Sequence, residues 1–438
     1  MGRQEQTNHL FSNRDLRILL VPLIVEQILN SLMGTADSIM VSNVGSAAIS
    51  AVSLVDSINI LVIQAFYALA AGGTIVCSQY IGQKDKKNAE ESARQLSFVV
   101  ACISSAVMAV CLLTRGPLLR LIFGSVEANV MEAAQIYFFY TALSFPFIAL
   151  YDAGSSICRA QGNTRLPMTI AVVSNGLNIA GNAVLIWGFH LGVAGAAIAT
   201  LGSRVISAGV VFAFLHNPSQ EIAVRDYLHI RPDGRRIMRI LSLGIPNGIE
   251  NAMFQFGKLA IQSTVSTLGT IAIAAQAMTN ILENLNGIAA IGIGIGMMTV
   301  VGQCLGAGRK DEAIYYIKKL TAVAEIVIIA SCALVFLATK PVTILGGMEP
   351  ESAKMCLYMV GWITVVKPIV WNAGCRGCEV FDDFLLHQYV GVPGDAVHLS
   401  LSRPRLRTDR GVDRHVYRLD DPGHRIHIPL YGPEMARA

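Results

Sequence analysis

The chain has 438 residues, of which 53% are hydrophobic and only 15% are charged, and its mean hydropathy is +0.52. A soluble domain usually carries about 25% charged residues, so this chain has too few polar side chains to cover a globule in water. The net charge of +4 is mild and does not indicate a nucleic-acid partner. The nine cysteines lie mostly singly inside apolar runs, which is not the pattern of a secreted disulfide framework.

Ten apolar segments follow one another along the chain. Most reach the roughly 20 residues that a helix needs to cross the hydrocarbon core of a bilayer. Only helices and closed barrels satisfy their own backbone in lipid, and these segments lack the alternation of barrel strands. We therefore predict an all-α polytopic membrane protein with spans at Leu16–Ile39, Ser50–Val76, Phe98–Leu113, Ala133–Tyr151, Met168–Phe189, Val193–Leu215, Ile237–Val265, Ile273–Val301, Leu320–Leu337 and Met355–Trp371.

Basic residues mark one side of the predicted membrane. They precede the first span and follow the second, fourth, sixth and eighth, whereas the other loops hold little beyond Arg115, Arg120, Lys340 and Lys354. The positive-inside rule therefore predicts a cytoplasmic N-terminus and a multi-pass protein of the cell inner membrane.

The sequence matches itself without a gap when it is shifted by 224 positions. The matched residues include polar or conformationally special ones, namely Pro22 with Pro246, Glu26 with Glu250, Gln79 with Gln303 and Gly82 with Gly306. The first copy holds six spans, an even number, so both copies start from the same side of the membrane. Parallel repeats of this kind are a common build of alternating-access transporters.

The repeat predicts two parallel, pseudo-symmetric helix bundles. Residues 1–215 form an N-lobe of six transmembrane helices, and the polar stretch 216–236 is the cytoplasmic linker. Residues 237–374 form a C-lobe of about four transmembrane helices, two fewer than the repeat requires.

Six stretches between Leu16 and Asn372 form recognisable motifs, namely Pro22–Glu26, Met33–Ser42, Gln79–Gly82, Cys158–Pro167, Asn178–Asn182 and Gly302–Gly308. They resemble the multidrug and toxic compound extrusion (MATE) family, in its NorM-like bacterial branch. The resemblance implies a secondary active multidrug efflux antiporter, not an enzyme, that exports cationic or amphipathic drugs in exchange for Na⁺ or H⁺. We expect a monomer in the lipid bilayer, with no cofactor beyond the coupling ion, no metal site and no nucleic-acid partner.

An ionisable group inside a membrane span is expensive and is a functional candidate by default. Asp37 lies late in the first span, and Asn175, Asn178 and Asn182 share one face of the fifth because their spacing is three and four. A carboxylate facing amide oxygens suits a hard cation and suits a proton site equally well. By resemblance, Asp37 and Asn178 match the family's coupling site, and Asn182 stands where some members carry a second aspartate. Hydrogen bonding between helices is the alternative reading of all four.

Three glutamates are candidates for contact with substrate or for a C-lobe site. Glu26 and Glu250 occupy equivalent places, each four residues after a proline that we expect to start or break its helix. Their alternative role is a helix-start carboxylate near the interface, where the helix dipole stabilises it. Glu283 lies in the eighth span within a polar cluster and is the best C-lobe candidate, with packing as its alternative.

Residues 375–438 are rich in Arg, His, Asp and Pro and contain no apolar run of membrane length. We interpret this tail as read out of frame, because a one-base shift of plausible codons restores segments like the family's last two helices. A genuine cytoplasmic tail is the alternative. Without two helices the C-lobe cannot bury its inner faces, so we expect poor folding and no transport from the chain as written.

Three other functions compete with drug efflux. A lipid-linked oligosaccharide flippase of the same superfamily needs several cationic residues in its cavity, and Lys258 and Arg204 are the obvious candidates. An integral membrane enzyme needs clustered histidines or carboxylates, but the nine histidines lie mostly in the linker and the tail. The third alternative is a nonfunctional truncated product.

Overall fold

The computed structural model describes residues 9–42, 44–124, 126–225, 231–266, 270–345 and 348–368. All regular structure within these ranges is helical, which confirms the all-α class. The predicted out-of-frame tail, 375–438, lies outside the described residues, so its interpretation stays a prediction.

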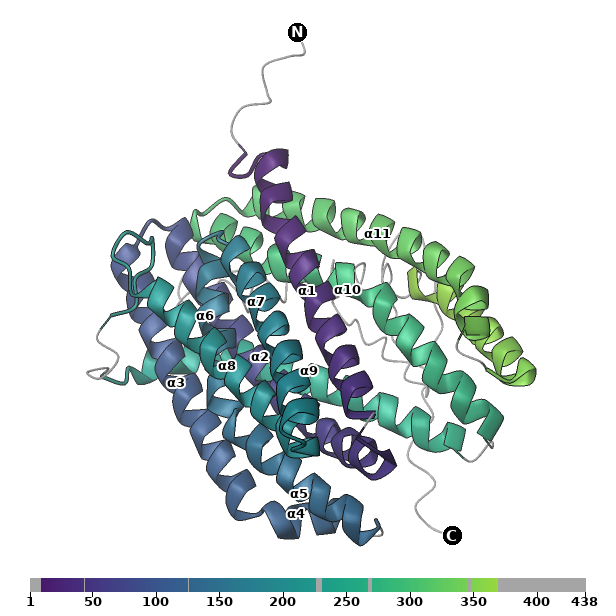
Figure 1. The fold of residues 1–438 in the computed structure, drawn as a ribbon. Helices are drawn as coiled ribbons and strands as arrows, with labels where there is room; N and C mark the ends of the chain where they lie inside the picture. Colours follow the sequence, from purple (N-terminus) through teal and green to yellow (C-terminus); the bar gives the residue numbers. More distant parts are fainter. Residues whose placement is uncertain are drawn as a thin grey trace, which may run out of the picture. The chain divides into compact units, whose positions relative to one another are not determined.

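The helices follow one another along the chain as Figure 1 shows. The first group, called the N-lobe below, comprises α1 (Asn13–Ser42), α2 (Ser46–Gly82), α3 (Lys86–Leu113), α4 (Arg115–Phe123), α5 (Ala128–Leu143), α6 (Phe145–Ala160), α7 (Arg165–Asn182), the π-helix η1 (Ala183–Gly188) and α8 (Gly192–Leu215). The second group, called the C-lobe, comprises α9 (Gly234–Ser266), α10 (Thr270–Gly306), α11 (Lys310–Leu345) and a helix over residues 350–368.

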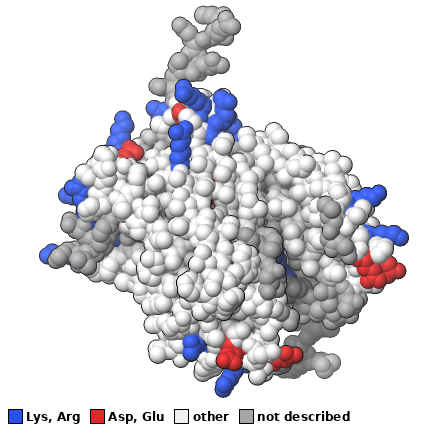
Figure 2. All heavy atoms as spheres, viewed as in Figure 1, with Lys and Arg blue, Asp and Glu red and all other residues white. Residues whose placement is uncertain are grey.

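Seven described helices are long and apolar enough to cross a membrane, and α5 with α6 makes an eighth span if the pair is taken together. The fourth predicted span is therefore two helices, bent by 41° at a break. The break falls at Ser144, and Pro146 follows in the first turn of α6, where its missing N–H costs no hydrogen bond. On the face shown in Figure 2, charged side chains gather toward the ends of the helices and leave a broad uncharged band.

The third span is longer than predicted, because α3 begins at Lys86 rather than near Phe98. Asp85 caps it by accepting a hydrogen bond from the backbone N–H of Asn88 at 3.1 Å. The backbone and side-chain hydrogen bonds of Asn88 hold the pKa of Asp85 below its ordinary value.

The expectation that Pro22 and Pro246 start or break their helices is wrong, since both lie inside α1 and α9. Proline lacks the N–H that would bond the carbonyl four residues earlier, which for Pro22 is the carbonyl of Ile18. The Thr164 hydroxyl donates to that oxygen at 3.4 Å. A neighbouring side chain thus satisfies the freed backbone group, as membrane helices require.

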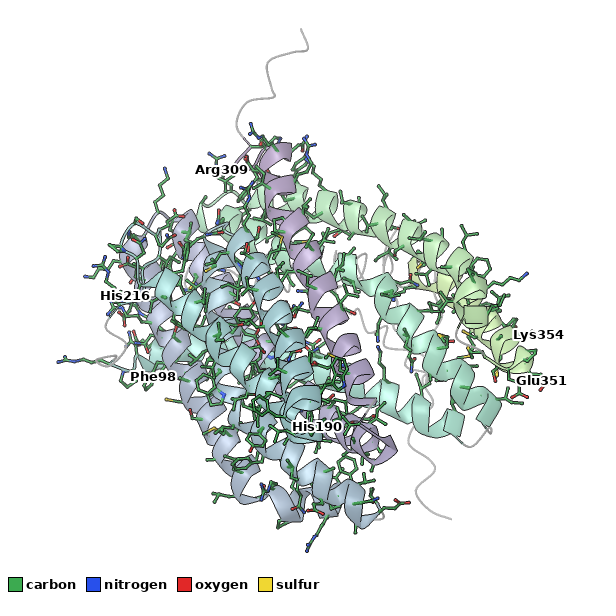
Figure 3. The ribbon with its side chains drawn as sticks, in the orientation of Figure 1. Phe98, His190, His216, Arg309, Glu351 and Lys354 are labelled. Carbon is green, nitrogen blue, oxygen red and sulfur yellow. The ribbon has the colours of Figure 1, made fainter. Side chains whose placement is uncertain are left out.

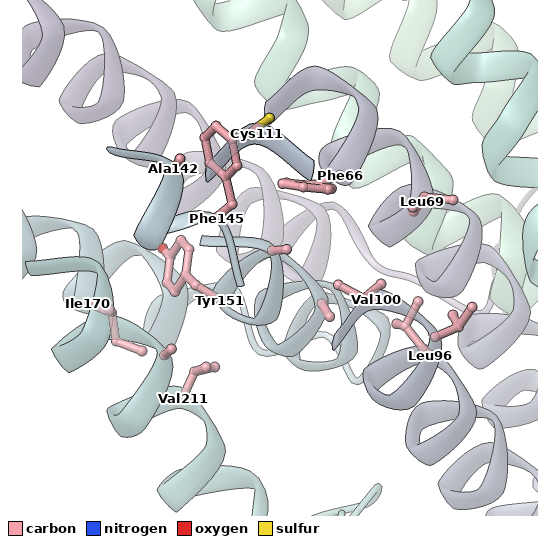
Figure 4. Packing of buried hydrophobic residues seen from close by; sticks show 14 of the residues in the cluster. Phe66, Leu69, Leu96, Val100, Cys111, Ala142, Phe145, Tyr151, Ile170 and Val211 are labelled. Carbon is pink, nitrogen blue, oxygen red and sulfur yellow. The ribbon is translucent and has the colours of Figure 1, made fainter. Parts of the chain in front are cut away.

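The hydrophobic core of the N-lobe packs helices α2, α3, α5, α6 and α8 together. Figure 4 shows its centre, where the rings of Phe66 and Phe145 meet edge to face with centroids 6.0 Å apart. A second cluster joins the two lobes by packing Leu19 and Leu23 of α1 against Ile293 of α10 and Tyr316 of α11. The core therefore holds α1 and α2 in place around the polar groups described below.

The repeated Gln-x-x-Gly motif forms a close contact between the lobes. A Cβ atom on Gly82 of α2 would lie 2.1 Å from the backbone oxygen of Gln303, and one on Gly306 of α10 would lie 2.0 Å from that of Gln79. Each glycine therefore lies against the backbone of the opposite motif, and no larger residue fits either position without moving a helix.

We predict that Gly82→Ala and Gly306→Ala each lower the thermal unfolding midpoint of the purified protein. Overpacking of a close contact costs about 1–3 kcal/mol. Gly209→Ala in α8 is the matched control, because nothing lies within 4 Å of its Cβ position. A midpoint for Gly82→Ala equal to that of the control would show that the contact is not close in solution.

Candidate functional site

A chain of hydrogen bonds inside the N-lobe connects α1, α7 and α8. The Asn182 side-chain amide donates to Asp37 Oδ1 at 2.6 Å and to Asn178 Oδ1 at 3.3 Å. Asn178 in turn donates to Thr200 Oγ1 at 3.2 Å. Asn178 and Asn182 have no exposed surface. The structure thus brings together three of the four residues chosen from the sequence and adds Thr200.

Asn175, the fourth of these residues, has a different partner. Its side-chain amide donates to the backbone oxygen of Leu29 in α1 at 2.9 Å. This bond connects α7 to α1 at a point more than one helical turn from Asp37. The observed contact of Asn175 therefore holds the two helices together.

The local backbone helps to place Asn182. The α-helix α7 ends at this residue and continues as the π-helix η1, which runs to Gly188. π-turns occur frequently at functional sites. His190 and His216 mark the two ends of α8, which carries Thr200 (Figure 3).

The Asp37 group offers oxygen atoms for a cation. The side-chain oxygen of Asn182 is buried and has no hydrogen-bond partner, although most buried polar atoms have one. It belongs to the residue whose amide nitrogen donates to Asp37 and Asn178, and Asn178 in turn donates to the Thr200 hydroxyl. A carboxylate with amide and hydroxyl oxygens is the donor set that a hard cation takes, so these residues fit Na⁺.

A second polar group lies beside the first. Asp56 of α2 accepts hydrogen bonds from Asn59 at 3.2 Å and from the Tyr137 hydroxyl at 3.4 Å. Arg204 of α8 donates to Ser144 Oγ at 2.7 Å. The Arg204 guanidinium interacts electrostatically with Asp37, Asp56 and Asp152. These three carboxylates therefore lie in the field of the same cation. Its Nε atom and Asp152 Oδ2 are buried without a partner.

Sequence reasoning missed Asp152 and Thr200. Asp152 follows the predicted fourth span by one residue and was therefore not counted as an intramembrane carboxylate. The structure places it inside α6, so the rule that flagged Asp37 applies to it as well. Thr200 carries no comparable signal, because a threonine in an apolar helix is ordinary.

Glu26 forms a buried ion pair. Its Oε1 lies 2.6 Å from Nη2 of Arg159 in α6, and the two side chains are only 1% and 5% exposed. The equivalent Glu250 in α9 is exposed, so the two glutamates of the repeat occupy unlike surroundings. The helix-start interpretation of Glu26 is also wrong, since the residue lies within α1.

Glu283 of α10 faces a lysine from the last described helix. Lys367 Nζ lies 3.8 Å from Glu283 Oε1 and donates to the Glu283 backbone oxygen at 3.2 Å. Both side chains are about a quarter exposed, at 24% and 28%. Nearby Asn286 is buried, and neither polar atom of its side chain has a partner.

Comparison with known proteins identifies the family. The MatE family model matches residues 22–184 and again residues 246–377, together more than half of the chain. The chain belongs to the MatE family. Its two matches begin at Pro22 and Pro246, the residues that define the internal repeat. The second match ends at 377, close to residue 375, where we place the start of the aberrant tail.

Named relatives are similar over most of their length. The chain is 26% identical to the uncharacterized transporter YisQ of Bacillus subtilis over 369 residues, which cover 83% of this chain and 79% of YisQ. It is 26% identical to the probable multidrug resistance protein NorM of Thermotoga maritima over 376 residues, covering 83% and 80%.

Solved structures share the fold. An outward-facing multidrug resistance MATE transporter of the MOP superfamily matches with a TM-score of 0.77 at 19% identity, covering 86% of this chain and 82% of that one. A MOP superfamily transporter from Pyrococcus furiosus matches with a TM-score of 0.76 at 20% identity over the same shares. The MatE chain therefore has the architecture of a membrane transporter.

We predict that Glu26→Gln destabilises the protein strongly, because it leaves the Arg159 cation buried and uncompensated. Removing one partner of a buried ion pair costs roughly 3–5 kcal/mol. Glu250→Gln, at the repeat-related and exposed position, is the matched control and leaves the thermal unfolding midpoint nearly unchanged. Equal midpoints for the two variants would contradict a structural ion pair at Glu26.

Proposed function

We propose that the chain is a secondary active efflux antiporter that exports cationic or amphipathic small molecules in exchange for Na⁺ or H⁺. Relatives named as multidrug resistance proteins, such as NorM and MdtK, support small-molecule efflux. The observation that supports ion coupling is a chain of hydrogen bonds within the N-lobe, which links Asp37, Asn182, Asn178 and Thr200. We place the protein in the cell inner membrane as a monomer with a cytoplasmic N-terminus.

The proposed coupling follows from the cost of charge in an apolar span. Without a cation, the Asp37 carboxylate depends on the Asn182 amide and on the field of Arg204. Binding of Na⁺ or a proton neutralises it and removes the need for those interactions. Because α1, α7 and α8 all contribute to this group, its occupancy shifts the balance between the two orientations of the transporter.

The flippase alternative finds less support. It requires an excess of positive charge to hold pyrophosphate, and Arg204 was one of its candidate residues. The Arg204 guanidinium instead donates to the Ser144 hydroxyl and lies in the field of three carboxylates, so it does not supply an excess of positive charge.

We predict that Na⁺ raises the thermal unfolding midpoint of the purified protein at fixed pH and ionic strength, with K⁺ as the comparison salt. A ligand that binds only the folded state at 100 times its Kd stabilises by about 2.7 kcal/mol. Asp37→Asn abolishes the rise, whereas Asp311→Asn, an exposed aspartate at the start of α11, preserves it.

A flat response to Na⁺ in the unchanged protein would assign coupling to H⁺. The direct test of function is extrusion of ethidium from a drug-sensitive strain under imposed Na⁺ or H⁺ gradients. It compares the present sequence with a gene whose tail is restored to the shifted frame, each with and without Asp37→Asn, and we expect extrusion from the restored gene alone. Ion-driven extrusion that survives Asp37→Asn would overturn the proposed coupling site.

A further inference from the structure

A cavity of about 570 Å³ lies between the start of α3 and the segment that leads into α9. We call it the linker pocket. The residues that matter for its chemistry are Lys87, Asn88 and Arg94 of α3 and Arg231, Asp233 and Arg236 of the segment before and within α9. It is separate from the Asp37 group and takes no part in the proposed antiport.

Specific hydrogen bonds build the walls of the linker pocket. The Gln95 side-chain amide donates to the Arg231 backbone oxygen at 2.7 Å, and the Asp233 backbone N–H donates to Gln95 Oε1 at 3.1 Å. Arg236 Nη2 donates to Asn88 Oδ1 at 2.9 Å. Gln95 has no exposed surface. The pocket is thus an ordered structure in which α3 of the N-lobe is bonded to the entry of the C-lobe.

The acidic residues that line the pocket, Glu90, Glu91 and Asp233, already have partners. Glu90 Oε1 lies 3.8 Å from Lys86 Nζ. Asp233 accepts hydrogen bonds from Arg236 Nε at 2.9 Å and from the Arg235 backbone N–H at 3.0 Å. Burial raises the pKa of Asp233, but the backbone N–H groups of Arg236 and Arg235 outweigh it and lower that pKa overall. Glu91 accepts from the Gln95 amide at 3.0 Å and lies 3.6 Å from Arg94.

The basic residues keep unused hydrogen-bond donors. Arg94 Nε and Arg236 Nη1 are both buried and have no acceptor. Their side chains are 31% and 27% exposed, and both residues line the cavity. Lys87 and Arg231 add two exposed cations to the rim. Because the acids are engaged and four basic residues line the cavity, the pocket favours a ligand that carries negative charge.

The position of the pocket at the ends of helices indicates which kind of anionic ligand it meets. The membrane-length helix α3 begins at Lys86, and α9 begins at Gly234, so two helices start at the pocket. Arg239, further along α9, lies over the ring of Tyr80 at 5.6 Å from its centroid. A tyrosine and arginines at the end of a span are typical of the headgroup level of a bilayer.

We propose that the linker pocket binds the phosphate group of an anionic phospholipid, with Arg94 and Arg236 as its donors and Lys87 and Arg231 at the rim. Guanidinium groups bind phosphate oxygens with charge-assisted hydrogen bonds. A phosphate held by Arg94 of α3 and Arg236 of α9 joins the N-terminal parts of two helices that belong to different lobes. Anionic lipid therefore strengthens the attachment of the linker segment to the N-lobe.

Native mass spectrometry of the full chain tests the proposal, with phosphatidylglycerol and phosphatidylcholine as the probes. We expect phosphatidylglycerol to be retained in preference, and the double variant Arg94→Gln with Arg236→Gln to lose about tenfold in apparent affinity, which corresponds to about 1.4 kcal/mol. Arg165→Gln, an exposed arginine at the start of α7, is the matched control and retains the preference.

The double variant Arg94→Lys with Arg236→Lys controls for loss of lipid binding through misfolding, because it keeps both charges. It should retain more phosphatidylglycerol than the glutamine pair. High salt should weaken binding, since the rim charges are screened. Inorganic phosphate is the second probe. Phosphate binding without a preference for phosphatidylglycerol would overturn the assignment to a lipid, and an unchanged preference in the glutamine pair would overturn the site.

Discussion

A polar group inside an apolar span must find its partner within the protein, and this constraint organises the N-lobe. The carbonyl that Pro22 leaves free takes the Thr164 hydroxyl. The Glu26 carboxylate takes Arg159, and Arg204 takes the Ser144 hydroxyl at the break between α5 and α6. Each partner comes from a different helix, so the polar bonds also determine which helices are neighbours. Asp37, the proposed coupling residue, likewise takes its partner from another helix, because the Asn182 amide of α7 donates to it.

The two copies of the repeat share backbone features but place their charged residues in different surroundings. Pro22 and Pro246 both lie inside long helices, and the two Gln-x-x-Gly motifs lie against each other. Glu26 is buried in an ion pair, whereas Glu250 is exposed. The Asp37 group has no equivalent among the described C-lobe residues, where Glu283 is paired with Lys367. The described part of the chain therefore concentrates its candidate coupling chemistry in one lobe.

Much of this fold could be predicted from the sequence, because hydropathy and helical spacing are local properties. The spacing of Asn178 and Asn182 placed both on the face that meets Asp37. The partners could not be predicted, since Arg159 and Thr200 lie far from Glu26 and Asn178 in the chain and packing alone brings them together. The break at Ser144 was missed for a related reason: hydropathy measures composition, and a bend leaves composition unchanged. Asp152 was missed because the end of a span was placed too early.

The contact between Gly82 and Gly306 has a consequence for how the lobes can move. At this point backbone lies against backbone, so no side chain is available to swing aside and admit water or solute. A side-chain gate could open by degrees, one rotamer at a time. A contact made of main chain can open only if entire helices separate. Both α2 and α10 pack against several other helices. In the proposed alternating access, opening at this end therefore requires the movement of whole helices rather than of single side chains.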